Sequence, residues 1–281
     1  MATEGDVPGG DRLSVKLAAD CERCSGLCCV APAFSASADF AFDKPAGLPC
    51  HHLLPSFRCD IHTHLRSDGM RGCAVYDCFG AGQQVSQVTF AGADWRAAPH
   101  LAGQMFDAFA VMRQLHELLW FLTAALSMPT SSALRHKVYL ARETIEQLTV
   151  LDADSLVALD VDARRNEANT VLLAVSEHVR AGVGPAALDH RGARLIGASL
   201  PAADLTGANL RGALLIGADL TAADLTLADV TGADVRDTDF SGANLADSLF
   251  LTQAQLEAAK GDIRTRLPAT LNRPRHWQRA Y

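Results

Sequence analysis

The sequence predicts a multidomain α+β protein made of a small cysteine-rich head, an α-helical middle segment and a C-terminal solenoid. All eight cysteines lie between Cys21 and Cys78. Apolar residues then recur at helical spacing, and a five-residue pattern occupies residues 193 to 250. The expected boundaries are a disordered leader at 1–20, the head at 21–90, the helical segment at 95–184, the solenoid at 185–252, and a capping helix with a basic tail at 253–281.

The five-residue pattern starts at Ala193 and continues through twelve units to Phe250. The first position of a unit is Ala in ten of the twelve, and the third is always Leu, Val or Phe. A period of five fits neither the 3.6-residue turn of a helix nor the two-residue repeat of a strand. A fixed short period of this kind is typical of a solenoid.

The pattern A-(D/N)-L-x-x resembles the pentapeptide-repeat family, in which four repeats form one square coil of a right-handed, quadrilateral β-helix. This resemblance implies that residues twenty apart stack on one another. Leu205, Leu225 and Leu245 are then one interior ladder, and Leu200, Leu220 and Phe240 are another. Small Ala side chains suit the narrow interior. Seven glycines are expected at the corners: Gly192, Gly197, Gly207, Gly212, Gly217, Gly232 and Gly242.

The cysteines of the head form two groups, and the chain shows no apolar export signal, so reduced thiols that bind metal are favoured over disulfides. The first group has the order Cys21-x-x-Cys24-x-x-x-Cys28-Cys29, and the second comprises Cys50, Cys59, Cys73 and Cys78. Thiolates suit zinc or iron in tetrahedral sites. Eight cysteines would fill two such sites, and the adjacent Cys28 and Cys29 would serve one each unless one of them stays free.

This cysteine order resembles the C-x-x-C-x-x-x-C-C family of zinc- or iron-chelating proteins over about 60 residues. The resemblance implies all eight cysteines as metal ligands and leaves the metal open between zinc, iron and an iron-sulfur cluster. Two histidines near cysteines, His51 and His62, are alternate ligands that could replace a thiolate. A histidine in that position more often lies behind the ligands than among them.

The segment between Pro99 and Val183 is poor in Gly and Pro, and its apolar residues lie three and four apart, which predicts helices. A break is expected at Pro129, followed by helices over 137–148 and 164–180. The pair His116-Glu117 begins a zinc-protease-like motif, but Trp120 stands where the second His belongs. No catalytic residue is assigned, and a non-enzymatic protein is favoured.

Charge is uneven along the chain, whose net charge is −7. The solenoid has four Arg against nine Asp, and residues 253–281 have six basic against two acidic residues. The basic tail is therefore expected to cap the acidic solenoid rather than to bind nucleic acid. No apolar run approaches the roughly 20 residues that cross a bilayer. These features predict a cytoplasmic protein without a membrane or nucleic-acid partner.

The favoured function is a metal-binding protein whose pentapeptide solenoid is a scaffold for a protein partner. Asp204, Asp224 and Asn244 would stack into an acidic stripe that such a partner could contact. One alternative is a metal-dependent oxidoreductase or protein-modifying enzyme. A second is a DNA mimic that binds gyrase, as some pentapeptide-repeat proteins do. Three coils at about 4.8 Å per layer would span only about 14 Å, or about four base pairs, which disfavours the mimic.

Overall fold

The computed structural model describes residues 17–183 and 189–278, and the chain divides into two compact units. The first unit comprises Met1–Ser127 and Ser131–Leu172, and the second Met128–Thr130 and Leu173–Tyr281. The head and the first helices thus share one unit, although the sequence treated them as separate segments. Residues 1–16 of the predicted leader lie outside the described residues, whereas Leu17 is only 5% exposed.

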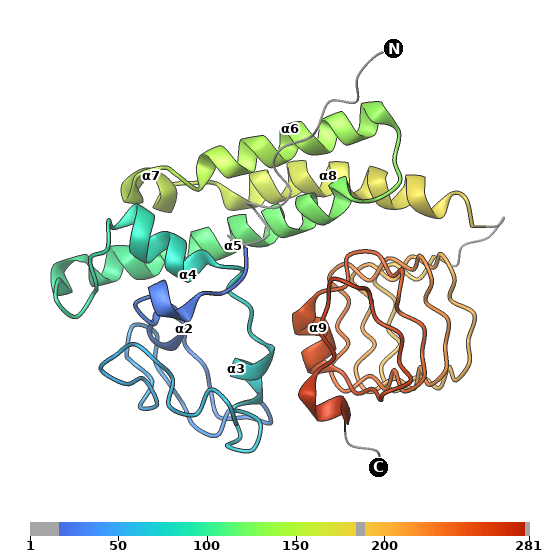
Figure 1. Ribbon diagram of the computed structural model, residues 1–281, viewed down its shortest axis with the longest axis horizontal. Coiled ribbons are helices and arrows are strands. Elements are labelled where there is room, and N and C mark those ends of the chain that lie inside the picture. The colour runs from blue at the N-terminus through green and yellow to red at the C-terminus, as the bar shows by residue number, and fades with distance from the viewer. Residues whose placement is uncertain (1–16, 184–188, 279–281) are drawn as a thin grey trace. The chain divides into compact units, whose positions relative to one another are not determined.

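The helical part of the structure is built on α5 (Ala102–Leu126), which packs against α6 (Ser132–Leu148) and α7 (Ala153–Val157). Helix α8 (Val161–Arg180) follows, and Figure 1 shows α5, α6 and α8 as long ribbons. One face of α5 is fully buried because its apolar residues recur every three or four positions. Ser131 and Asp152 cap α6 and α7 with side-chain oxygens, which explains where both helices begin.

The head contains only short elements joined by loops. These are η1 (Cys21–Arg23), α2 (Leu27–Val30), α3 (Arg71–Val75), α4 (Ala81–Gln84), the π-helical turn η2 (Val85–Thr89) and η3 (Pro99–Leu101). Two isolated antiparallel bridges, Phe34 with Lys44 and Leu53 with Cys59, are the β-pairs found within its described residues. The backbone of the head is therefore held by turns and by scattered hydrogen bonds between loops, such as the one from the N–H of Gly72 to the carbonyl oxygen of Asp39 at 2.8 Å.

Helix α5 supports the head from one side. His116 is buried, and its Nδ1 lies 2.7 Å from the carbonyl oxygen of Phe79. Arg113 donates from Nε to the carbonyl oxygen of Asp77 at 3.0 Å. Both contacts hold the segment around Cys78 against α5. The ring of His116, which begins the zinc-protease-like pair His116-Glu117, therefore has a structural role.

The repeat forms stacked coils (Figure 1). Four parallel columns of backbone bridges join residues twenty positions apart. The first coil pairs Asp189, Arg194, Ser199 and Asp204 with the next, and those partners pair with the third. The predicted ladders are confirmed, because Leu225 and Leu245 are fully buried and Phe240 is 1% exposed. The chain therefore contains the solenoid that its period predicts.

The sides of the predicted β-helix are short, because the described residues form single-residue bridges and no extended strand. Each side of a coil has only five residues, and a turn begins on both sides of every bridge. All seven predicted corner glycines have φ between +64° and +70°. Ala202, Ala222, Leu227 and Asp237 adopt the same left-handed conformation at other corners, with φ between +53° and +58°.

The stack continues beyond the predicted end at residue 252, because Lys260 pairs with Asp239 and Arg266 with Asn244. Helix α9 (Gln253–Ala258) precedes this layer and starts with a capping box between Thr252 and Gln255. In the tail, η4 (Arg275–Gln278) places the indole of Trp277 in the core, where it is 1% exposed. The tail therefore closes the C-terminal end of the solenoid.

Among the described helices, none combines the length and the apolar character that crossing a membrane requires. This includes α5, the longest of them, whose 25 residues contain Arg113, His116 and Glu117.

Candidate functional site

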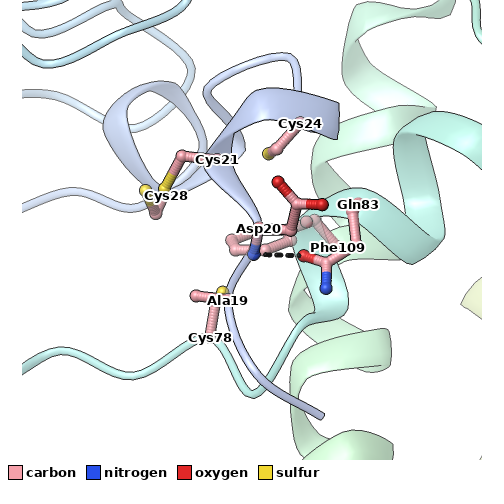
Figure 2. Close-up of a pocket in the computed structure, with 9 residues that line it drawn as sticks. Ala19, Asp20, Cys21, Cys24, Cys28, Cys78, Gln83 and Phe109 are labelled. Carbon is pink, nitrogen blue, oxygen red and sulfur yellow. Dashed lines mark hydrogen bonds between the residues drawn. The ribbon is translucent and has the colours of Figure 1, made fainter. Parts of the chain in front are cut away.

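A small pocket in the head brings together four of the eight cysteines (Figure 2). Its volume of about 20 Å³ is close to that of one water-sized sphere. The pocket is lined by Ala19, Asp20, Cys21, Cys24, Cys28, Cys78, Gly82, Gln83 and Phe109. These residues come from η1, α2, α4, α5 and the loop before α4, so segments far apart in sequence meet here.

Cys24 lies just before helix α2, whose first backbone N–H groups have no side-chain cap. Gly26 is the N-cap residue, and its φ of +71° turns the chain so that the N–H groups face the sulfur. Burial raises the pKa of the Cys24 thiol, while hydrogen bonds from the backbone N–H groups of Leu27 and Gly26 act in the opposite direction. Such bonds stabilise a thiolate and are typical of sulfur atoms that bind metals.

Cys78 repeats this arrangement before helix α4, with Gly80 as an N-cap residue at φ +78° and again without a side-chain cap. Burial raises the pKa of the Cys78 thiol, and the backbone N–H groups of Gly80 and Gly82 oppose the rise. Gly82 also leaves room for the other sulfur, because a Cβ at this position would lie 2.5 Å from Cys24 Sγ. The two helix starts thus place two sulfurs at one pocket.

Cys21 and Cys28 complete the pocket set. Asp20 caps η1 through its side chain, and the backbone N–H of Asp20 donates to Gln83 Oε1 at 3.1 Å. The Sγ atoms of Cys28 and Cys29 are 3.9 Å apart. The hydrogen bond between these two thiols raises the pKa of Cys28 and lowers that of Cys29. Cys29 is absent from the pocket lining, so the two neighbours face different surroundings.

The remaining cysteines are grouped by backbone contacts away from this pocket. The backbone N–H of Cys50 donates to the carbonyl oxygen of Cys29 at 2.9 Å. Residues 50–59 then fold back, with Leu53 bridged to Cys59. Burial raises the pKa of Cys59 to about 11, against a hydrogen bond from the N–H of Ile61. The second set begins with these three cysteines.

Cys73 lies on α3 and joins the second set electrostatically. Burial raises the pKa of Cys73 to about 12, and the nearby thiols of Cys29, Cys50 and Cys59 contribute to the rise. Burial also raises the pKa of Cys50, while the backbone N–H of His52 opposes it. The sequence predicted all eight thiols as ligands, and of their division it predicted only that Cys28 and Cys29 would serve one site each unless one of them stayed free.

The histidines of the head have other contacts. His51 is exposed, and its ring centroid lies 4.2 Å from that of Phe42. His62 is also exposed on the loop after Cys59. His52, which the sequence did not single out, has its Nδ1 3.0 Å from Asp60 Oδ1. The proposal that His51 or His62 replaces a thiolate therefore stays a prediction.

All eight cysteines are free thiols. Within residues 17–183 and 189–278, no group of three His, Cys, Asp or Glu side chains is already arranged to hold a metal ion. The donor chemistry of the four pocket cysteines, which form the first set, fits a thiophilic metal. Their four sulfurs line one small pocket, and two of them accept backbone hydrogen bonds. Binding would require side-chain rotations that bring the sulfurs together.

The predicted acidic stripe is stacked as expected, because Asp204 is bridged to Asp224, and Asp224 to Asn244. Its polar atoms are largely engaged within the coils. Asp224 Oδ1 accepts from the backbone N–H of Thr226 at 2.9 Å and from Asn244 Nδ2 at 3.2 Å. These bonds lower the pKa of Asp224, led by the Thr226 hydroxyl. The stripe therefore stabilises the turns, and partner binding stays a prediction.

The sequence was compared with protein-family models and with known proteins, and both comparisons found a match. The family described as pentapeptide repeats matches with eight copies, at residues 191–226, 203–242 and 223–260. The uncharacterized protein YybG of Bacillus subtilis is 54% identical over 271 residues, which cover 95% of this chain and 97% of that protein. The chain belongs to the YybG family and is a pentapeptide-repeat protein.

Sequence reasoning about this pentapeptide-repeat protein missed three residues that shape the head. Gly82 makes room for Cys24, and Ser86 Oγ lies 3.0 Å from Ser25 Oγ and accepts from the Ser25 N–H at 3.0 Å. Lys44 is 4% exposed among the second set of cysteines. One signal was available: Cys24-Ser-Gly26 and Cys78-Phe-Gly80 share the form C-x-G before a helix.

Proposed function

We propose that this protein binds a thiophilic metal in its cysteine-rich head and uses its pentapeptide solenoid as a scaffold for a protein partner. The first metal site consists of Cys21, Cys24, Cys28 and Cys78. One observation carries this proposal: these four thiols line a single small pocket, at which two glycine-capped helix starts each direct backbone N–H groups to a sulfur.

The chemistry of the pocket favours zinc or iron over a hard cation. Calcium and magnesium prefer oxygen ligands, whereas thiolates bind zinc, iron and iron-sulfur clusters. Each metal-bound thiol must lose its proton, and burial without metal opposes this loss. The N–H groups of Gly26, Leu27 and Gly80 offset part of that opposition at two of the four sulfurs. When bound, the metal would supply the positive charge that stabilises all four thiolates.

The scaffold role is supported by the shape of the second unit. Its columns hold side chains at fixed spacing, and its core consists of aliphatic and aromatic residues. A rigid surface of this kind suits recognition of another macromolecule. The experiment for this part is affinity capture with the full chain, with Asp204→Lys expected to reduce capture.

The metal proposal is tested by anaerobic purification of the full chain, followed by measurement of zinc and iron and an absorption spectrum. We expect bound metal that is lost from Cys24→Ser and Cys78→Ser. Colourless stoichiometric zinc would support a structural site, and a brown chromophore would support iron-sulfur chemistry. Equal metal content in wild type and both variants would contradict the first site.

A matched control is Ser248→Cys, which adds a thiol to the half-buried surface of the solenoid, outside the head. It leaves the eight native cysteines in place and should not change metal content. Far-UV circular dichroism of each variant checks that a loss of metal is not caused by unfolding of the helices.

A further inference from the structure

The two ends of the solenoid differ in how well their cores are covered. At the C-terminal end, Trp277 is 1% exposed and belongs to the same apolar core as Leu245, which is fully buried. At the N-terminal end, Leu195 and Leu200 are only partly buried, and Ile196 is 51% exposed. The core is therefore closed at one end and partly uncovered at the other.

The backbone of the first coil also has a free edge on the uncovered side. In the second coil, the bridge residues donate their N–H groups back to the first coil, as Asp219 does to the carbonyl oxygen of Ala198 at 2.8 Å. The corresponding residues of the first coil are Arg194, Ser199 and Asp204. Among the described residues, no backbone hydrogen bond begins at the N–H groups of these three. Such an edge is a template for pairing with another chain.

The chain enters the solenoid at one corner and leaves two sides of the first coil clear of this entry. Arg180, at the end of α8, donates to the carbonyl oxygen of Gly207 at 3.3 Å. A Cβ on Gly207 would lie 3.1 Å from Val183 Cβ. Gly207 is at the corner where the fourth side of the first coil leads into the second coil. The sides that carry Arg194 and Ser199 do not adjoin this corner.

The first coil has one bridge residue on each of its four sides, and all four of these residues are exposed. In chain order they are Asp189, Arg194, Ser199 and Asp204. Two are acidic, one is basic and one is a neutral hydroxyl donor. The guanidinium group of Arg194 has no ion-pair partner within residues 17–183 and 189–278. The charge of Arg194 is therefore available to an acidic group of another molecule.

The order of these four residues suits contact with a second copy of the same coil. If two copies meet end to end, a twofold axis crosses the square coil through opposite corners or through opposite sides. Three of the four such axes place like charges together, because Asp189 meets Asp204, or Asp189 or Arg194 meets its own copy. Like charges in contact disfavour an interface. The fourth axis passes through the corner between Asp189 and Arg194. It places Asp189 against Arg194, and Ser199 against Asp204.

We propose that two copies of this chain join end to end through their first coils, about the twofold axis that pairs Asp189 with Arg194. The facing segments then run antiparallel, so that the free N–H groups of each first coil donate to carbonyl oxygens of the other. The contact also covers Leu195 and Leu200. Because the tail closes the other end of the solenoid, assembly stops at two copies and does not continue as a filament. This inference does not depend on metal binding.

Sedimentation velocity of the full chain measures the assembly, in a reducing buffer that keeps the free thiols from linking two copies. We expect a dimer that dissociates on dilution from submillimolar to micromolar concentration, as small interfaces do. The dimer should form equally with and without chelator. A monomer throughout, or species larger than a dimer, would overturn the proposal. A dimer that is lost on chelation would show that the head joins the copies, which also overturns it.

Arg194→Asp tests the predicted charge pairs. The substitution places a carboxylate against Asp189 at two symmetric positions, so the dissociation constant of the dimer should rise by about tenfold or more. Asp247→Lys is the matched control, because it changes the charge by the same amount at an exposed residue of the third coil. It should leave the dissociation constant unchanged. If both variants dimerise like wild type, the contact lies elsewhere and the proposed interface is wrong.

Amide hydrogen exchange resolved to single residues tests the edge itself. The amides of Arg194, Ser199 and Asp204 should exchange fast in dilute protein and slowly in concentrated protein, because only the dimer gives them acceptors. The amide of Asp219, which already donates to the first coil, should exchange slowly in both. Slow exchange of the first three in the monomer would show that another segment of the same chain covers the edge. Fast exchange in the dimer would show that the copies join elsewhere. Either result refutes the proposal.

Discussion

The head and the solenoid both hold non-helical backbone in place with backbone hydrogen bonds, but only those of the solenoid repeat regularly. In the solenoid, each coil donates its backbone N–H groups to the next coil, as Leu205 does to Asp224 at 2.8 Å, and the core is aliphatic. In the head, the described residues include only two isolated bridges, and the interior contains thiols and Lys44. The comparison indicates that backbone pairing at a fixed spacing makes the solenoid self-sufficient, whereas the backbone hydrogen bonds of the head follow no repeating pattern.

Metal removal gives the largest expected difference between the two regions. Structural thiolate sites contribute about 10 kcal/mol of folding free energy, so chelation should loosen residues 21–78. The solenoid should be unaffected, because each coil is stabilised by its neighbours. Hydrogen exchange of the full chain, with and without chelator, should show lost protection in the head and slow exchange in residues 195–250. Uniform loss along the solenoid would refute this independence.

Leu225→Lys tests the aliphatic core of the solenoid. Leu225 is fully buried in the middle of its ladder, so the substitution places an unpaired charge in an apolar interior. We expect a loss of about 5 kcal/mol and no cooperative melting of the second unit. Ile196→Lys is the matched control, because Ile196 is 51% exposed and should tolerate the charge. An unchanged melt of Leu225→Lys would place Leu225 outside the ladder.

The solenoid contains a buried ion pair between Arg211 and Asp229. Arg211 Nη1 is 2.9 Å from Asp229 Oδ2, and the Asp229 side chain is fully buried. Arg211→Met should cost about 3 kcal/mol, because it leaves the carboxylate without its partner. Denaturant unfolding of Arg211→Met/Asp229→Asn should recover much of this loss. If the double variant is no more stable than the single one, the pair is not the cause.

Gly82→Ala tests how closely the head is fitted around its sulfurs. The added methyl group would lie 2.5 Å from Cys24 Sγ, so we expect a loss of about 2 kcal/mol and weaker metal binding. Gly103→Ala is the control, because a Cβ on Gly103 meets nothing within 4 Å. Thermal melting and metal content measure the two effects. Equal behaviour of both variants would show that the pocket has room to spare.

The smallest effect is expected at a corner of the solenoid. Ala222 has φ +58°, a conformation that costs an L-residue about 1 kcal/mol and glycine little. Ala222→Gly should therefore stabilise the second unit by up to about 0.5 kcal/mol, after the entropy cost of glycine. Gly212→Ala, at φ +64° in open space, should destabilise it by a similar amount. A lower melting temperature of Ala222→Gly would indicate that the methyl group packs usefully.

Most of the solenoid could be predicted because its determinants repeat locally. Positions twenty apart must stack whatever the rest of the chain does, so Leu205, Leu225 and Leu245 were assigned correctly to one ladder. The end of the stack could not be predicted in the same way. Lys260 and Arg266 extend it after α9 without following the repeat pattern, because the tail contributes backbone pairing rather than repeat side chains.

The amino-acid sequence by itself determined the solenoid, the positions of the main helices and the concentration of thiols in the head. Only the tertiary structure decided which thiols meet. Cys24 and Cys78 are distant in sequence and line one pocket, whereas of the adjacent Cys28 and Cys29 only Cys28 lines it. A repeat encodes its contacts in a fixed spacing, but a loop-rich head makes them through chain reversals and the packing of α4 and α5, which no local pattern records.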